Sequence, residues 1–242
     1  MTLTVPVLSA GLARIAAHME GAADELNALD GQLGDGDLGV TMVRGGREIV
    51  KTLPSLPADV GMALMACAQA FTRASGSSYG TLLATALLSA AKATKGRTEV
   101  PWAEVPALLA GALAAMMARG KASLGEKTVL DALDAAAKAV EGQDDPAKML
   151  AAATAAVDAT LERMRDMPAK VGRARIFAER SVGLDDPAKM LADATAAVDA
   201  TLERMRSMPA KVGRARIFAD RSVGLDDPGQ VAFREILRGL KA

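Results

Sequence analysis

The sequence predicts an all-α protein, and two observations support this fold class. Half of the 242 residues are apolar but only 2% are aromatic, and Ala, Leu and Met, which favour helices over strands, dominate the apolar set. Apolar residues also recur at helical spacing along much of the chain. Because a chain of this length can bury one core, we expect a single domain over residues 1–242.

The periodic segments predict nine helices, with ends defined to within a few residues. They cover residues 8–30, 38–53, 58–73, 80–95, 103–118, 127–142, 146–166, 187–207 and 229–241. Apolar stripes define the first helix through Leu12, Ile15, Met19, Leu26 and Leu29, the seventh through Leu150, Ala153, Val157, Leu161 and Met164, and the last through Val231, Ile236, Leu237 and Leu240. The eighth helix repeats the stripe of the seventh.

Charge and apolar patterning argue against several classes of partner. The formal net charge is zero and basic residues are scattered, so nothing predicts a nucleic-acid surface. The longest apolar run, Ala107–Ala118, is too short to cross a bilayer, and the N-terminus lacks the basic region of a signal peptide. We therefore expect a soluble, cytoplasmic protein with no nucleic-acid or membrane partner. The single cysteine, Cys67, excludes an intrachain disulfide.

The connection after the first helix carries the strongest chemical signal. The eleven residues Leu29–Gly39 contain three carboxylates and four glycines. Asp is a hard oxygen ligand suited to Mg²⁺, glycine permits tight turns, and crowded carboxylates repel one another unless a cation lies among them. Asp30, Asp35 and Asp37 therefore predict a metal and phosphate site, and hence phosphoryl transfer.

Two other motifs overlap this loop and fit it less well. Gly34, Gly36 and Gly39 match G-x-G-x-x-G, but a dinucleotide fingerprint follows a strand, whereas here a helical pattern precedes it. An EF-hand counted from Asp35 would have Gly46 where a bidentate Glu belongs. Taken alone, the loop is also compatible with an ordinary solvated helix connection.

The wider sequence resembles one family. Asp30, Asp35 and Asp37, followed by Gly39 and Met42, resemble the L-D-x-x-x-G-D-x-D-H-G-x-x-M signature of the nucleotide-binding L subunit of dihydroxyacetone kinase, the DhaL family. Three further motifs follow in the family's order, namely Ala74–Thr81, Arg119–Thr128 and Gly213–Gly229. The resemblance covers residues 26 to 229 and makes the solvated-loop interpretation the weaker one.

This resemblance implies a fold and a ligand set. The fold would be an up-and-down antiparallel barrel of eight helices with nucleotide across one end, which leaves one of the nine predicted helices extra. Mg²⁺ would be held by Asp30, Asp35 and Asp37. ADP or ATP would be bound by Leu38, Gly39, Val40, Thr41, Ser75, Gly76, Gly120, Val129, Arg214, Asp227, Pro228 and Gly229. No side chain is assigned covalent or acid–base chemistry.

Several of these residues also have plain structural interpretations. Ser75 and Gly76 can simply cap the next helix, and Gly120 and Val129 can pack a helix connection. Asp227 and Pro228 form a good N-cap and first-turn pair, and an arginine such as Arg214 often makes a surface salt bridge.

One position departs from the family pattern. Leu38 stands where the family usually has His. If the His side chain contacts the nucleotide or orders the metal ligands, Leu38 weakens nucleotide binding; if only the backbone at this position contributes, Leu38 leaves binding unchanged.

The implied function needs partners. The family's sugar site, with its substrate-holding histidine, lies on a separate K polypeptide, and this chain has only His18, remote from the motifs. The resemblance implies transfer of phosphate to a small ketose, with bound ADP recharged by a phosphoenolpyruvate-fed M subunit or exchanged for ATP. Two alternatives are a non-catalytic subunit that binds a transcription regulator and a folded but inactive variant. The nucleotide domains of fatty-acid kinases fit the loop less well.

A tandem repeat occupies the C-terminal part of the chain. Residues 144–184 recur as residues 185–225, with differences only at Ala152/Asp193, Asp166/Ser207 and Glu179/Asp220. Two copies are too few for a solenoid, and the family pattern needs one.

We predict that the second copy completes the nucleotide site, because it alone runs into Asp227-Pro228-Gly229 and the last helix. The first copy would then lie outside the barrel, or exchange between molecules in a domain-swapped homodimer.

Overall fold

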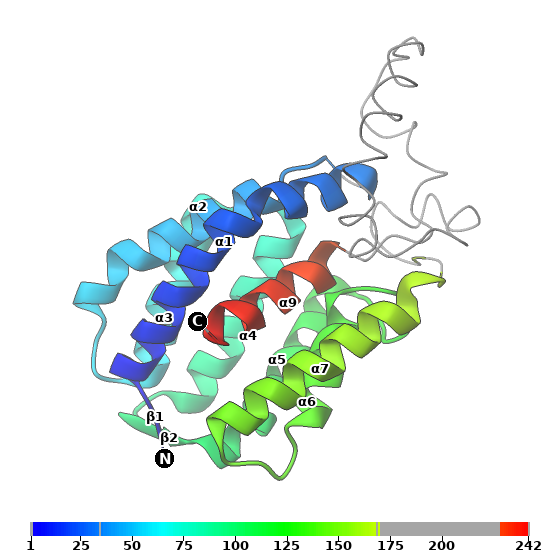
Figure 1. The fold of residues 1–242 in the computed structure, drawn as a ribbon. Helices are drawn as coiled ribbons and strands as arrows, with labels where there is room; N and C mark the ends of the chain where they lie inside the picture. Colours follow the sequence, from blue (N-terminus) through cyan, green and yellow to red (C-terminus); the bar gives the residue numbers. More distant parts are fainter. Residues whose placement is uncertain (1, 34, 168, 170–227, 242) are drawn as a thin grey trace, which may run out of the picture.

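The computed structural model describes residues 2–33, 35–167, 169 and 228–241, and this part of the chain is almost entirely helical (Figure 1). The helices are α1 (Val5–Leu33), α2 (Leu38–Thr52), α3 (Val60–Ala74), α4 (Ser78–Thr94), α5 (Val105–Gly120), α6 (Val129–Ala139), α7 (Pro146–Arg165) and α9 (Pro228–Lys241). Short 3₁₀ turns cover Leu53–Ser55 and Trp102–Glu104. The all-α class is confirmed. The predicted helix over 187–207 lies outside the described residues.

The helices contact one another in chain order. Each helix from α1 to α6 packs against the next, α7 packs against α9, and α9 returns to α1. This cyclic order is the one that an up-and-down ring of helices requires, and it brings the two ends of the chain's helical part together. The barrel arrangement itself remains a prediction.

One core fills the space between these helices. Its buried members come from α1, α2, α3, α6, α7 and α9 and include Met19, Leu26, Leu38, Phe71, Val157 and Val231. Close helix packing depends on small residues. A Cβ on Gly45 would lie 2.2 Å from Phe71 Cε2, so only glycine lets α2 approach the Phe71 ring.

A two-stranded ribbon lies at the end of the molecule where the chain begins (Figure 1). Strands β1 (Thr2–Thr4) and β2 (Glu99–Pro101) pair antiparallel, with Leu3 opposite Val100. Val100 is fully buried against Val5 and Val60. Sequence periodicity does not predict this ribbon, because three-residue strands are too short to show a period of two.

The position of α7 corrects one expectation. This helix belongs to the first copy of the repeat, and its apolar stripe is buried in the core at Ala153, Val157, Leu161 and Met164. The prediction that the first copy lies outside the bundle is therefore wrong for its helix. The reason is the short connection of residues 140–145, which makes α7 the packing neighbour of α6.

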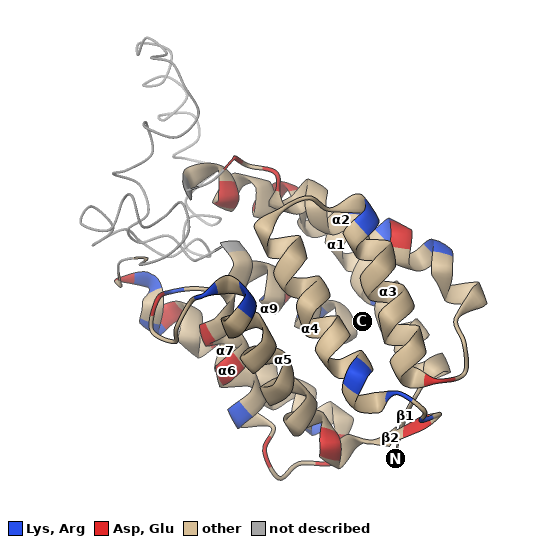
Figure 2. Cartoon of the chain, turned by 180° about the vertical axis from the view of Figure 1, so that it is seen from behind, with Lys and Arg blue, Asp and Glu red and all other residues tan. Residues whose placement is uncertain are grey.

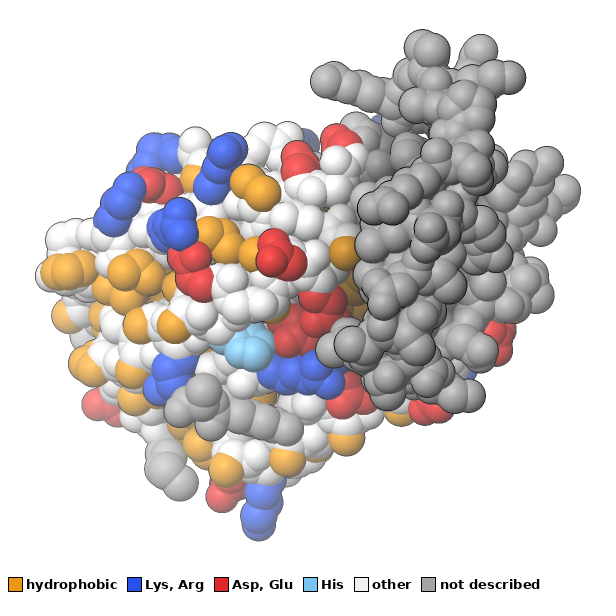
Figure 3. Space-filling model, turned by 45° about the horizontal axis from the view of Figure 1, so that its top comes forward, with side chains coloured by type: hydrophobic (Ala, Val, Ile, Leu, Met, Phe, Trp, Pro, Cys, Tyr) orange, Lys and Arg blue, Asp and Glu red, His pale blue; other side chains and the backbone are white. Residues whose placement is uncertain are grey.

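Helix α9 contacts α1 through close packing and through a cluster of charged side chains. A Cβ on Gly239 would lie 3.0 Å from Ile15 Cα. Beside this contact, His18 Nε2 lies 2.8 Å from Glu235 Oε2, and both Arg234 and Arg238 donate to the Glu235 carboxylate. Figure 3 shows this group of acidic and basic side chains around the single histidine.

Helices α4 and α5 carry few charged residues along their length (Figure 2). By length and composition alone, the stretch Trp102–Gly120 could cross a membrane. In the structure, α5 packs against α4 and α6, and one such helix is weak evidence for a membrane. The expected absence of a membrane partner rested on the shorter run Ala107–Ala118 and stays a prediction.

Candidate functional site

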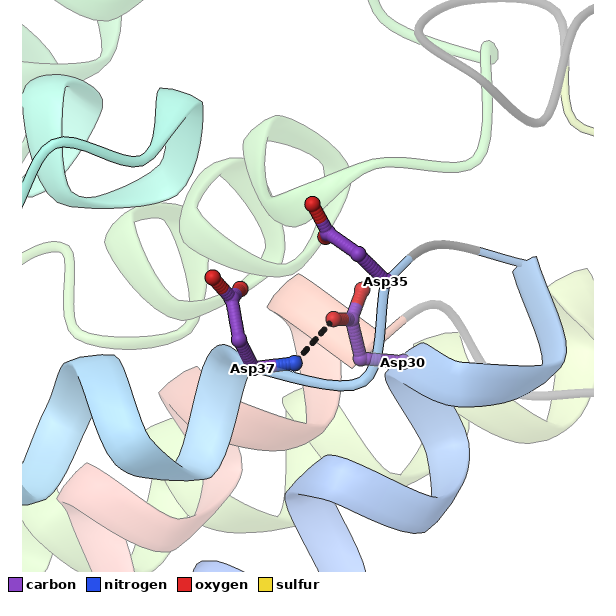
Figure 4. Close-up of side chains that lie close together, drawn as sticks. All are labelled: Asp30, Asp35 and Asp37. Carbon is purple, nitrogen blue, oxygen red and sulfur yellow. Dashed lines mark hydrogen bonds between the residues drawn. The ribbon is translucent and has the colours of Figure 1, made fainter. Parts of the chain in front are cut away.

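Three carboxylates meet at the junction of α1 and α2. Asp30 lies in the last turn of α1, and Asp35 and Asp37 follow in the connection. One oxygen from each side chain lies within 4.8 Å of the others. The Asp37 N–H donates to Asp30 Oδ2 over 2.9 Å and draws the two ends of the loop together (Figure 4). The predicted acidic cluster is therefore assembled by local backbone geometry.

The electrostatics of this cluster favour a bound cation. Burial raises the pKa of the Asp30 carboxyl above its ordinary value, and the charges of Asp35 and Asp37 raise it further. The N–H groups of Asp37 and Gly36 oppose this shift without cancelling it. A divalent cation would relieve the repulsion among the three groups.

Two glycines and an asparagine give the loop its shape. Gly36 has a φ of +73°, a conformation that glycine adopts without strain. A Cβ on Gly39 would lie 2.0 Å from the Ala23 carbonyl oxygen, so glycine is required where α2 crosses α1. Asn27 Oδ1 accepts the Val40 N–H over 3.2 Å. The start of α2 is thereby held against α1.

At the N-terminus of α2, the structure corrects the prediction that Val40 and Thr41 bind nucleotide through their backbone N–H groups. The Val40 N–H donates to Asn27, and the Thr41 N–H donates to the Asp37 carbonyl over 2.8 Å. These two N–H groups are therefore engaged within the protein. Leu38 is 5% exposed and belongs to the core, so only its backbone can contribute to a site. The family's His position thus holds a packing residue in this chain.

In the connection between α3 and α4, the residue that caps α4 is different from the two residues that were predicted to bind nucleotide, Ser75 and Gly76. Ser77 caps α4, because its Oγ accepts the Gly80 N–H over 3.0 Å. Ser75 is not the cap. Its N–H donates to the Phe71 carbonyl at the end of α3, and its Oγ lies 3.3 Å from that of Ser77. A Cβ on Gly76 would meet no atom within 4 Å, so packing does not require glycine there.

At the connection between α5 and α6, Val129 was predicted to bind nucleotide, but the structure favours a packing role for it. Val129 is 6% exposed and clusters with Met116 and Leu133. Gly120 ends α5 in an exposed position, followed by Lys121 in the left-handed conformation with a φ of +50°. Gly120 thus remains at the surface of this end of the bundle.

The last group of predicted residues is only partly described. Arg214 and Asp227 lie outside the described residues, as does Arg173, the counterpart of Arg214 in the first copy. Pro228 and Gly229 form the first turn of α9.

A buried polar network links the ends of α6, α7 and α9. Lys127 is 2% exposed, and its Nζ donates to the carbonyl oxygens of Arg165 and Met167 over 2.8 and 2.9 Å. Gln230 is fully buried, and its Nε2 donates to the Thr128 carbonyl over 2.8 Å. The network ties the start of α9, and the chain leaving α7, to the same connection.

Comparison with known proteins identifies the family. The profile of the DAK2 domain matches residues 32–188 and 186–242. The chain belongs to the DAK2 domain family. The two matched segments meet inside the duplicated region, at residues 186–188. The family expected from the four motifs is thereby confirmed.

Relatives of this DAK2 domain are components of kinases. "PEP-dependent dihydroxyacetone kinase 2, ADP-binding subunit DhaL" of Listeria innocua is 31% identical over 172 residues, 69% of this chain and 80% of that protein. Human "Triokinase/FMN cyclase" is 33% identical over 170 residues, 67% of this chain and 29% of that protein. The matched region is thus 80% of the DhaL subunit but only 29% of the human enzyme.

Solved structures support the helical fold of the DAK2 domain. The dihydroxyacetone kinase of C. freundii matches with a TM-score of 0.64 at 23% sequence identity, over 97% of this chain and 34% of that one. Its complex with AMP-PNP and Mg²⁺ matches with a TM-score of 0.63 at 22% identity. At this level of identity the likeness shows the fold alone.

Several residues that build this end of the DAK2 domain are not among the predicted site residues. Thr128 and Asp131 form a capping box at the start of α6, and the T-x-x-D spacing is a recognisable signal for it. The contacts of Asn27, Lys127 and Gln230 had no such local signal, because the atoms that they contact lie far away in the sequence and are brought near by folding.

Proposed function

We propose that this DAK2 domain is the nucleotide-binding subunit of a dihydroxyacetone-type kinase, which transfers a phosphoryl group to a small ketose held by a partner. The acidic loop carries the proposal, because it gathers three carboxylates within 4.8 Å at a helix junction. The name of the Listeria innocua relative, an ADP-binding subunit, supports the same assignment.

The chemistry of the loop fits a hard divalent cation. Asp30, Asp35 and Asp37 offer only carboxylate oxygens, the ligands that Mg²⁺ prefers. When bound, Mg²⁺ neutralises nucleotide phosphates and aligns them for in-line transfer. The pKa of Asp30 is raised because its charged form is unfavourable when buried and beside Asp35 and Asp37. A bound cation would stabilise that charged form. The C. freundii kinase, solved with AMP-PNP and Mg²⁺, gives a precedent within the same fold.

The nucleotide, ADP or ATP, would lie across this end of the helices. We assign its phosphates to the acidic loop, the backbone of Leu38 and Gly39, and the open connection at Ser75 and Gly76. Gly120 would border the base, and the first turn of α9 would close the site. Arg214 and Asp227 complete the proposed set from the sequence alone.

A separate substrate-binding subunit would be needed for turnover. His18, the only histidine, is engaged with Glu235 at the α1–α9 contact, so the chain has no histidine to hold a ketone at the acidic loop. We therefore propose a K subunit as acceptor partner. The relatives called PEP-dependent support an M subunit as phosphoryl donor, and direct use of ATP is the alternative.

Reconstitution tests this proposal. The chain would be incubated with Mg²⁺, ATP and dihydroxyacetone, with and without a K subunit, and dihydroxyacetone phosphate would be measured. We expect product above background only in the mixture, and at least about tenfold less with Asp37→Asn, because a metal ligand is lost. Robust phosphorylation by the isolated chain would overturn the dependence on a partner.

A further inference from the structure

Helix α7 occupies one defined position in the bundle, between α6 and α9. We call this position the α7 slot. Its occupant contributes a buried face, together with polar contacts to α9 and to the connection before α6. Met164 Sδ lies 3.4 Å from Gln230 Nε2, and Asp158 Oδ1 lies 3.9 Å from an Arg238 nitrogen. Lys127 Nζ donates to two backbone carbonyls at the end of α7, those of Arg165 and Met167.

The second copy of the repeat carries the same recognition features. Every buried residue of α7 has an identical counterpart 41 positions later, in the pairs Met149/Met190, Ala153/Ala194, Thr154/Thr195, Val157/Val198, Thr160/Thr201, Leu161/Leu202 and Met164/Met205. The partner of Arg238 is also repeated, as Asp199. Within the helix, only the half-buried Ala152 changes, to Asp193.

We propose that the α7 slot accepts either copy of the repeat. In one folded form residues 146–165 fill the slot, as in this structure. In the other form residues 187–206 of the same chain fill it, and the first copy is displaced. The two forms share one core, one acidic loop and one α9.

Chain connectivity permits both forms. With the first copy in the slot, the connections to α6 and α9 are residues 140–145 and 166–227; with the second copy they are 140–186 and 207–227. The distance from the end of the helix in the α7 slot to the start of α9 is short, because Gln230 in α9 contacts Met164 in α7. A connector of 21 residues reaches up to about 70 Å when extended, so length excludes neither form.

The balance between the two forms follows from loop closure and from one substitution. Loop-closure entropy scales with the logarithm of length and favours the first copy by about fourfold for these connections. Asp193 adds a carboxylate at a half-buried position where the first copy has alanine, which favours the first copy further. The second form is therefore the minor one in the unaltered chain.

Core substitutions in one copy at a time test the proposal. Val157 is fully buried, so Val157→Asp should expel the first copy and let the second take the slot. The protein should stay folded, with a lower midpoint of urea unfolding. Val198→Asp should leave the midpoint unchanged, and the double variant should lose cooperative unfolding. Ala159→Asp, at an exposed position of α7, is the matched control and should have little effect.

Hydrogen exchange identifies the occupant directly. Peptides from the two copies differ in mass through Ala152 and Asp193, so each helix can be followed separately. We expect protection to move from the first copy to the second in Val157→Asp.

Three results would overturn the proposal. Val157→Asp could unfold as completely as the double variant, the double variant could remain cooperatively folded, or Val157→Asp could fold only as a dimer. The last result would assign the slot to exchange between chains.

Discussion

At the scale of single residues, Asp30 shows how a candidate site can oppose the stability of its own fold. Its carboxyl is half-buried and faces two other acids, and its raised pKa means that the folded chain holds a proton there more tightly than the unfolded chain does. Charged Asp30 therefore lowers the free energy of unfolding at neutral pH in the absence of metal. Below the ordinary pKa of aspartate the group is protonated in both states, and this cost disappears.

Asp30→Asn should therefore stabilise the metal-free protein at neutral pH. Asn can still accept the Asp37 N–H, so the loop keeps its hydrogen bond. The gain in the free energy of unfolding should vanish as the pH falls below the ordinary pKa of aspartate, and saturating Mg²⁺ should reverse it, because metal stabilises the wild type. Urea unfolding with a chelator, at several pH values, measures this. A less stable Asp30→Asn at neutral pH without metal would contradict the account.

Gly39 is the residue on which the crossing of α1 and α2 depends. Gly39→Ala would place a Cβ 2.0 Å from the Ala23 carbonyl oxygen. We expect it to lower the free energy of unfolding by about 1–3 kcal/mol through overpacking. Gly21→Ala on α1 is the control, since a Cβ there meets nothing within 4 Å, and it should stabilise by up to about 1 kcal/mol through helix propensity. Equal stability of the two variants would refute the packing argument.

At the scale of elements, α9 docks through a charged contact as well as through its apolar stripe. Burial alone would raise the pKa of Glu235, but hydrogen bonds from His18 and Arg234, with the Arg238 charge, outweigh burial and hold that pKa below its ordinary value. Ionised Glu235 thus contributes stability above the ordinary pKa of glutamate, and this contribution is lost as the pH falls through the lowered value.

Glu235→Gln should lower the free energy of unfolding by about 1–3 kcal/mol at neutral pH, because the neutral amide has one acceptor oxygen instead of two and no longer balances the charges of Arg234 and Arg238. Exposed Glu162 on α7 provides the control, and Glu162→Gln should change stability little. The difference between Glu235→Gln and the wild type should shrink in acid. A pH-independent difference in thermal or urea unfolding would argue against the ion-paired contact.

Helix boundaries were largely predictable, because the apolar stripes and capping residues are local signals. The expected helices at 38–53 and 146–166 correspond to α2 and α7 within one residue. The position of α7 was not predictable from the stripe, since residues 146–165 and 187–206 carry the same one. The length of the connection after α6 determines which copy packs against α6. This effect becomes visible only in the folded structure, where the positions of the neighbouring helices are known.

At the scale of the whole molecule, the candidate site was predicted in part. Asp30, Asp35 and Asp37 lie within eight residues of sequence, so their meeting in space required only a turn. The roles of Val40 and Val129 depend on contacts with other helices, which the sequence motif cannot reveal. A partner subunit leaves no local sequence pattern, so the proposed kinase assembly rests on family resemblance and on the position of the single histidine, His18, at the α1–α9 contact.

We propose above all that the acidic loop binds Mg²⁺ and nucleotide together. Isothermal titration calorimetry with ADP, with and without Mg²⁺, tests it on the wild type, Asp35→Asn and Asp37→Asn. Asp144→Asn, an exposed substitution before α7, is the control. We expect Mg²⁺-dependent ADP binding that weakens by about tenfold or more in both loop variants and is unchanged in the control. Unaltered Mg²⁺-dependent affinity in both loop variants would contradict it.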